Sequence, residues 1–156
     1  MRSVMVKVIL VLAITSLGMF GADNTIGTWK RDMAKSKLTP PATNPIKNLT
    51  LMYQAIDGGV KVTATGERQD GTAINTSYSV KYDGKPVPVT GAVWDTTSMK
   101  RVDDNTVTFE NKKTGGKYHV TGKSVISKDG KTMTTTAKGT NDEGKPLTAT
   151  YIYDKQ

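Results

Sequence analysis

Apolar and polar residues alternate along most of the chain after residue 22, with the two-residue period of β-strands. Leu49, Leu51 and Tyr53 fall on one face of such a segment, and Thr50 and Met52 fall on the other. The same alternation recurs in five further segments, at 60–65, 74–82, 106–110, 132–137 and 147–153. Each segment therefore predicts a strand with one apolar face and one face rich in Thr, Lys and Ser.

Turn signals separate these segments at regular intervals. Asp-Gly, Gly-Gly or Glu-Gly pairs occur at 57–59, 70–71, 83–84, 115–116, 129–130 and 143–144. Most lie about 12–14 residues apart, which is typical of an antiparallel meander. The three prolines of residues 33–45 predict a connector or lid there rather than a strand. We find no amphipathic helical run after residue 22.

A meander of this kind most economically closes on itself, because closure leaves no unpaired strand edge. The pattern predicts an all-β fold: an antiparallel up-and-down β-barrel of eight to ten strands. A two-sheet sandwich is the main alternative.

The first 22 residues have a different composition. Arg2 and Lys7 precede an apolar run that extends to about residue 20, and no acidic residue occurs in it. The run is shorter than the ~20 residues that a membrane-spanning helix needs. We expect residues 1–22 to be a signal peptide and residues 23–156 to form a single secreted or periplasmic domain, with a retained anchor as the alternative.

Composition and charge narrow the function. The chain has no cysteine and one histidine, His119, which alternates with Tyr118 and Val120 and is expected to face solvent. No metal-ligand spacing, nucleophile–base–acid arrangement or phosphate-binding glycine loop is present. We therefore expect no catalytic residue, no metal and no cofactor. The net charge of +8 comes from lysines spread along the chain, which suit a solvated outer face better than a nucleic-acid site.

Short motifs at both ends of the predicted domain suggest a family. Gly27-Thr28-Trp29-Lys30 begins the first strand, and Tyr151-Ile152-Tyr153-Asp154-Lys155 ends the last. Together with the stretches at 34–37, 81–85, 99–103 and 127–133, they resemble the lipocalin and fatty-acid-binding-protein superfamily, above all the bacterial secreted lipocalin-like proteins. The resemblance implies an up-and-down barrel with a ligand inside and Trp29 as a plug of its closed end.

One departure from the family changes the expected ligand. Fatty-acid-binding proteins carry Arg-x-Tyr in the last strand, whereas this chain has Tyr151 and Tyr153 at those positions. A tyrosine offers one neutral hydrogen bond where arginine offers a charged fork, so a neutral or amphipathic ligand is expected. Arg101 could point inward as a substitute anion anchor or lie on the outer face, and Arg31 and Arg68 are expected at the surface. The candidate ligand-binding residues are Tyr151, Tyr153, Tyr78, Tyr53, Arg101 and Trp94.

The sequence thus predicts an exported, monomeric barrel that binds a small hydrophobic or amphipathic ligand inside and is not an enzyme. It predicts no nucleic-acid partner and no transmembrane segment in the mature chain. The alternative is a structural or interaction module of the cell envelope that acts through its outer surface. A barrel-type enzyme is the third hypothesis and would need a buried Asp or Glu beside Tyr151 or Tyr153.

Overall fold

A computed structural model describes residues 21–156, so all of the predicted signal peptide except Gly21 and Ala22 lies outside the described residues. The described chain forms ten strands and no helix that could cross a membrane. The strands are β1 (Gly27–Thr39), β2 (Ile46–Ile56), β3 (Gly59–Arg68), β4 (Ala73–Lys81), β5 (Val87–Pro88), β6 (Thr96–Asp103), β7 (Thr106–Lys112), β8 (His119–Ile126), β9 (Thr132–Thr140) and β10 (Pro146–Lys155).

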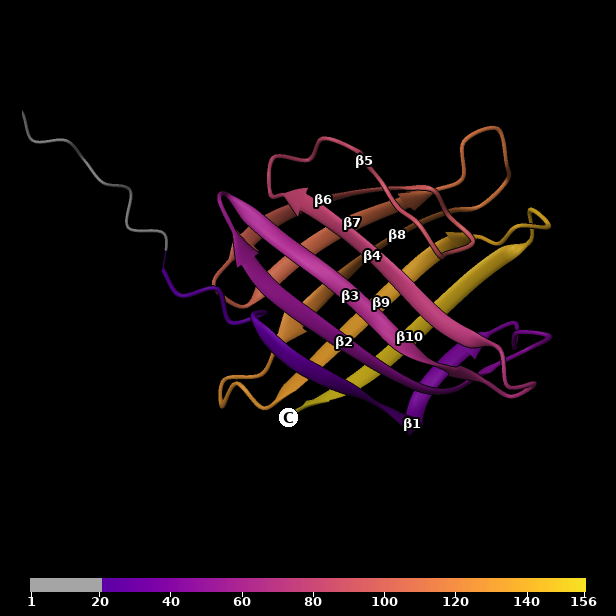
Figure 1. The fold of residues 1–156 in the computed structure, drawn as a ribbon, viewed down its shortest axis with the longest axis horizontal. Helices are drawn as coiled ribbons and strands as arrows, with labels where there is room; N and C mark the ends of the chain where they lie inside the picture. Colours follow the sequence, from indigo (N-terminus) through magenta and orange to yellow (C-terminus); the bar gives the residue numbers. More distant parts are fainter. Residues whose placement is uncertain (1–20) are drawn as a thin grey trace, which may run out of the picture.

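All ten strands belong to one antiparallel sheet with the order β4-β3-β2-β1-β10-β9-β8-β7-β6-β5. Every strand pairs with its sequence neighbours except β4 and β5, which form the two edges of the sheet, and β1 also pairs with β10, so the meander curls into a barrel (Figure 1). Isolated bridges join Ser77 to Thr90 and Asp83 to Lys100 where the two edges of the sheet meet. The predicted all-β, antiparallel up-and-down barrel of eight to ten strands is confirmed, and its closure is nearly complete, with isolated bridges between the two edges.

The prediction for residues 33–45 is partly wrong, because β1 continues to Thr39 and pairs with β10 again from Lys37 onward. A bulge between Asp32 and Lys37 makes this possible. The Asp32 carboxylate accepts hydrogen bonds from the backbone N–H groups of Ala34 and Lys35, each at 3.0 Å, and satisfies the backbone that leaves the ladder. The prolines end the strand only after the second pairing.

The two ends of the barrel differ in how they are filled. The closed end carries the β2–β3, β6–β7 and β8–β9 turns together with residues 21–26, and the open end carries the β1–β2, β3–β4, β7–β8 and β9–β10 loops (Figure 1). Large inward side chains such as Trp29 and Met133, both fully buried, lie toward the closed end. Inward positions nearer the open end include many small residues beside the bulkier Ile74, Val120 and Leu147; the small ones are Ala64, Gly66, Thr76, Ala137, Gly139 and Ala149. The fold therefore fills the closed end with larger side chains than the open end.

Candidate functional site inside the barrel

Tyrosines line the interior from several strands. Tyr53 on β2 and Tyr78 on β4 occupy the same alternating face as the buried valines of β3, and Tyr151 and Tyr153 do so on β10. Burial raises the pKa of Tyr53 well above its usual value and also raises the pKa of Tyr78, Tyr151 and Tyr153. The hydroxyls of these tyrosines are therefore neutral hydrogen-bonding groups.

Arg31 also points into this interior, so its predicted surface position is wrong. It lies opposite Tyr153 in the pairing of β1 with β10, and Nε and Nη2 donate to the Tyr153 hydroxyl at 3.2 and 2.5 Å. The guanidinium carbon lies 3.9 Å from the centre of the Tyr151 ring, a cation–π geometry. Arg31 also offsets part of the rise in pKa that burial causes in both tyrosines.

Arg31 forms no ion pair with any acid of residues 21–156, although the described structure holds seven ion pairs elsewhere. Arginine has five N–H donors in a fixed fork, and the contacts with Tyr153 use only Nε and Nη2. A half-buried cation that lacks a carboxylate yet keeps free donors is a ready anion site.

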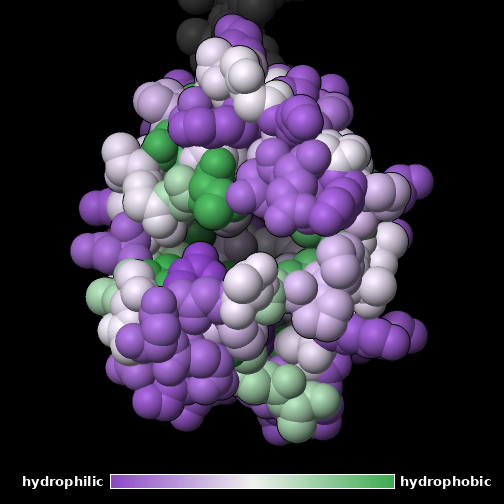
Figure 2. Space-filling model, turned by 90° about the vertical axis from the view of Figure 1, so that its right-hand side faces the viewer, coloured by the Kyte–Doolittle hydropathy of each residue, from purple (hydrophilic) through white to green (hydrophobic). Residues whose placement is uncertain are grey.

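The tyrosine hydroxyls face accessible space. Those of Tyr53, Tyr78, Tyr118 and Tyr151 make no hydrogen bond within the described residues, and each of these residues is only half-buried. Each of these hydroxyls keeps some solvent-accessible surface, because Trp94 Nε1 is the only side-chain nitrogen or oxygen of residues 21–156 that is both fully buried and without a hydrogen-bond partner. Figure 2, which looks onto the open end, shows a central hollow whose rim carries both hydrophobic and hydrophilic side chains. The interior thus combines apolar walls with unpaired hydroxyls and one cation.

Two aromatic residues meet at the open end. Trp94, just before β6, stacks on Tyr118, just before β8, with ring centres 5.7 Å apart and planes inclined by 20°. Burial raises the pKa of Tyr118, and the nearby Tyr151 contributes to the rise. The Trp94–Tyr118 pair therefore lies at the mouth of the tyrosine-lined space.

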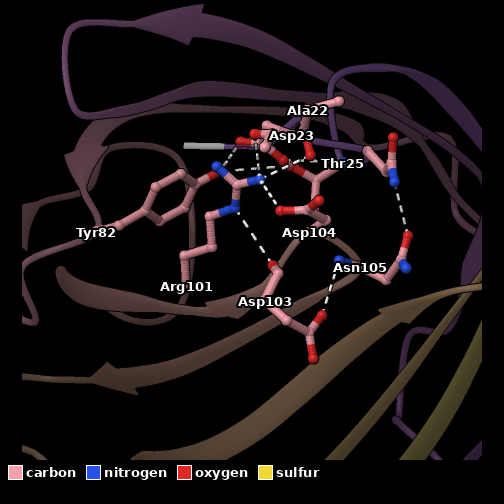
Figure 3. A network of polar contacts seen from close by, with 10 residues as sticks. Ala22, Asp23, Thr25, Tyr82, Arg101, Asp103, Asp104 and Asn105 are labelled. Atoms are coloured by element: carbon pink, nitrogen blue, oxygen red, sulfur yellow. Dashed lines mark hydrogen bonds and ion pairs between the residues drawn. The ribbon is translucent and has the colours of Figure 1, made fainter. Parts of the chain in front are cut away.

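Arg101 lies at the other end of the barrel and is not part of this site. Its Nη2 donates to the backbone oxygens of Gly21 and Ala22 at 2.8 and 2.7 Å and to the Asp104 carboxylate at 3.0 Å. Figure 3 shows the guanidinium enclosed by residues 21–23 and the β6–β7 turn. Arg101 pairs with the acid Asp104 and lies at the closed end, away from the tyrosine-lined space, so it is poorly placed to bind the anion of a ligand inside the barrel.

The same network seals the closed end. The Tyr82 hydroxyl donates to Asp23 at 2.6 Å, and Thr25 donates to the same carboxylate through its backbone and hydroxyl (Figure 3). The Trp29 indole N–H donates to the Thr25 carbonyl at 2.8 Å. Trp29 is fully buried against Leu49, Met133 and other core residues. Residues 21–26 and Trp29 thus close the barrel behind the tyrosine-lined space.

Sequence reasoning missed Arg31, although the signal was present. Arg31 follows Trp29 by two residues, so the strand period already places both side chains on one face. The general preference of arginine for the surface outweighed that signal. Arg68, also expected at the surface, is half-buried near the open end and donates to the Asn44 carbonyl at 3.0 Å.

Within residues 21–156, no group of three His, Asp or Glu side chains could hold a metal ion. His119 is exposed and pairs with Glu110 on the outer face, as the alternation predicts. No carboxylate forms a hydrogen bond with Tyr151 or Tyr153 among the described residues; the group in contact with both is Arg31.

Comparisons with known proteins give structural neighbours but no family. No protein-family model matches the chain, and no curated protein matches it. A solved structure of EF1p2_mFAP2b bound to DFHBI is similar with a TM-score of 0.47 and 11% identity, over 85% of this chain and 94% of that one. A redesigned β-barrel, mFAP1, bound to DFHBI, is similar with a TM-score of 0.41 and 16% identity, over 84% and 98% of the two chains.

Proposed function

We propose that this protein is a binding protein whose barrel holds one small amphipathic ligand, with the anionic end of the ligand at Arg31. The observation that carries the proposal is the half-buried guanidinium of Arg31, which stacks on Tyr151, is hydrogen-bonded to Tyr153 and has no acidic partner among the described residues. A bound carboxylate would accept hydrogen bonds from the N–H groups of Arg31 that Tyr153 leaves unused.

The rest of the interior suits the remainder of such a ligand. Apolar side chains form part of the rim of the hollow at the open end, and the hydroxyls of Tyr53 and Tyr78 are free to bind a second polar group. The Trp94–Tyr118 pair at the mouth offers aromatic surface to a ligand that enters there. The expectation of a neutral or amphipathic ligand rested on the missing arginine of β10, and we propose that Arg31 on the neighbouring strand supplies a cation in its place.

We propose that the protein binds its ligand and does not catalyse a reaction. The polar cluster consists of Arg31 and tyrosines, and among residues 21–156 no carboxylate is hydrogen-bonded within it. We also propose, from the N-terminal sequence, that the protein is exported and that its first 22 residues are removed.

A matched pair of ligands tests the proposal. Isothermal titration calorimetry with octanoate and with octanol presents the same chain with and without a negative charge. We expect one octanoate per barrel and weaker binding of octanol. Failure of both ligands to bind, or equal affinity for the two, would contradict the proposal.

A further inference from the structure

The outer face of β6–β9 carries a furrow that the interior site does not use. Its volume is about 620 Å³, and the side chains along it belong to alternate residues that point away from the barrel axis. One wall is the cross-strand row Lys100, Thr108, Lys123 and Thr136, and the other is the row Ser98, Glu110, Thr121 and Lys138. The backbone of the intervening row forms the floor: Met99, Phe109, Gly122 and Ala137.

The walls carry three lysines without an acidic partner. Lys100, Lys123 and Lys138 are exposed, and none of them belongs to an ion pair of the described residues. Lys100 and Lys123 share a row two strands apart, about 10 Å at the usual strand spacing, and Lys138 lies diagonally across the furrow from Lys123, about 7–8 Å away.

The acid in the furrow is already neutralised. Glu110 pairs with Lys112 at 2.9 Å and with His119 at 2.7 Å, and its pKa is lowered chiefly by the hydrogen bond from Lys112. The walls therefore present unpaired positive charge alternating with the hydroxyls of Ser98, Thr108, Thr121 and Thr136.

We propose that this furrow binds a linear anionic polysaccharide, with its carboxylate or sulfate groups on Lys100, Lys123 and Lys138. The complementary charge is supplied by three strands, and the hydroxyls along both walls match the hydroxyls of sugars. A furrow between two side-chain rows accepts a single extended chain, whereas a flat bilayer would meet only the tips of the lysines. The proposal is independent of the ligand inside the barrel.

The test compares two variants of the full protein that lose the same charge. The furrow variant combines Lys100→Gln, Lys123→Gln and Lys138→Gln; the control combines Lys30→Gln, Lys61→Gln and Lys81→Gln, which are exposed lysines of β1, β3 and β4 without ion pairs in residues 21–156. Binding of fluorescent alginate and heparin fragments is measured by anisotropy at low and physiological salt. Neutral dextran serves as the blank, and the two glycans separate carboxylate from sulfate recognition.

We expect the furrow variant to bind at least one of the two glycans roughly tenfold more weakly than the unmodified protein, since each exposed ion pair contributes modestly. The control should change its affinity by less than about twofold, and Glu110→Gln should strengthen binding. Octanoate binding should be the same in all variants. Equal losses in the furrow and control variants, no binding of either glycan, or a preference for anionic lipid vesicles over both glycans would overturn the proposal.

Discussion

Replacement of Arg31 by methionine removes the cation but keeps a side chain of comparable length inside the barrel. The lost contacts with an anionic ligand are charge-assisted hydrogen bonds, which contribute about 1.5–3 kcal/mol. Because about 1.4 kcal/mol corresponds to a factor of ten, Arg31→Met should weaken octanoate binding by roughly 10–150-fold. Octanol has no negative charge to pair with Arg31, so the affinity of the variant for octanol should change by less than about threefold.

The same substitution has two opposing effects on the stability of the free protein. It removes the contact of the guanidinium with the Tyr151 ring, about 0.5–2 kcal/mol, and also the cost of holding an unpaired cation half-buried. These effects offset one another, so the free energy of unfolding should shift by no more than about 1–2 kcal/mol. Chemical denaturation measures this shift and shows whether the variant is folded.

Lys30→Met is the matched control, because Lys30 is the exposed neighbour of Arg31 on β1 and carries the same charge. Calorimetry with octanoate and octanol on both variants completes the comparison. If a folded Arg31→Met protein bound octanoate as tightly as the original protein, or if Lys30→Met lost as much affinity, the role assigned to Arg31 would be refuted.

Three further predictions concern stability. Because burial raises the pKa of Tyr53 and Tyr153 above the unfolded value of 10.0, their stabilising contribution is present below pH 10 and is lost as the pH rises further; tyrosinate absorbance should therefore appear together with unfolding, and titration of all tyrosines near pH 10 in an intact barrel would disagree. Arg101→Ala should lower the free energy of unfolding by about 0.5–1.5 kcal/mol in urea, because it removes the hydrogen bonds of the guanidinium to the Asp103 carbonyl and the Asp104 carboxylate, whereas octanoate binding should stay unchanged. Gly122→Ala should cost about 1–3 kcal/mol, because its Cβ would lie 2.4 Å from the Phe109 ring and 2.5 Å from the Thr136 carbonyl; Thr121→Ala, at an exposed position on the same strand, should stay within about 0.5 kcal/mol.

The barrel could be predicted because its signal is local. The alternation of apolar and polar residues along β2, β4 and β10 predicts which side chains face inward. A barrel follows because closure of the meander leaves few strand edges unpaired. The continuation of β1 beyond Asp32 could not be predicted, since it depends on a bulge whose backbone is satisfied by that one carboxylate.

The site was predictable only in part. The inward position of Tyr53, Tyr78, Tyr151 and Tyr153 follows from the period of their strands. The place of Arg101 depends on contacts with residues 79 and 80 positions away in the chain, which no local pattern records. The furrow likewise requires the register of four strands, because Lys100 and Lys123 become neighbours across β7 only once the pairing is known.

A crystal structure of the protein with octanoate tests the central claim most directly. The account predicts one ligand inside the barrel, with its carboxylate within hydrogen-bond distance of the Arg31 guanidinium and its chain directed toward Trp94 and Tyr118 at the open end. A carboxylate at the mouth, a ligand confined to the outer surface, or an interior filled by the protein's own side chains would contradict it.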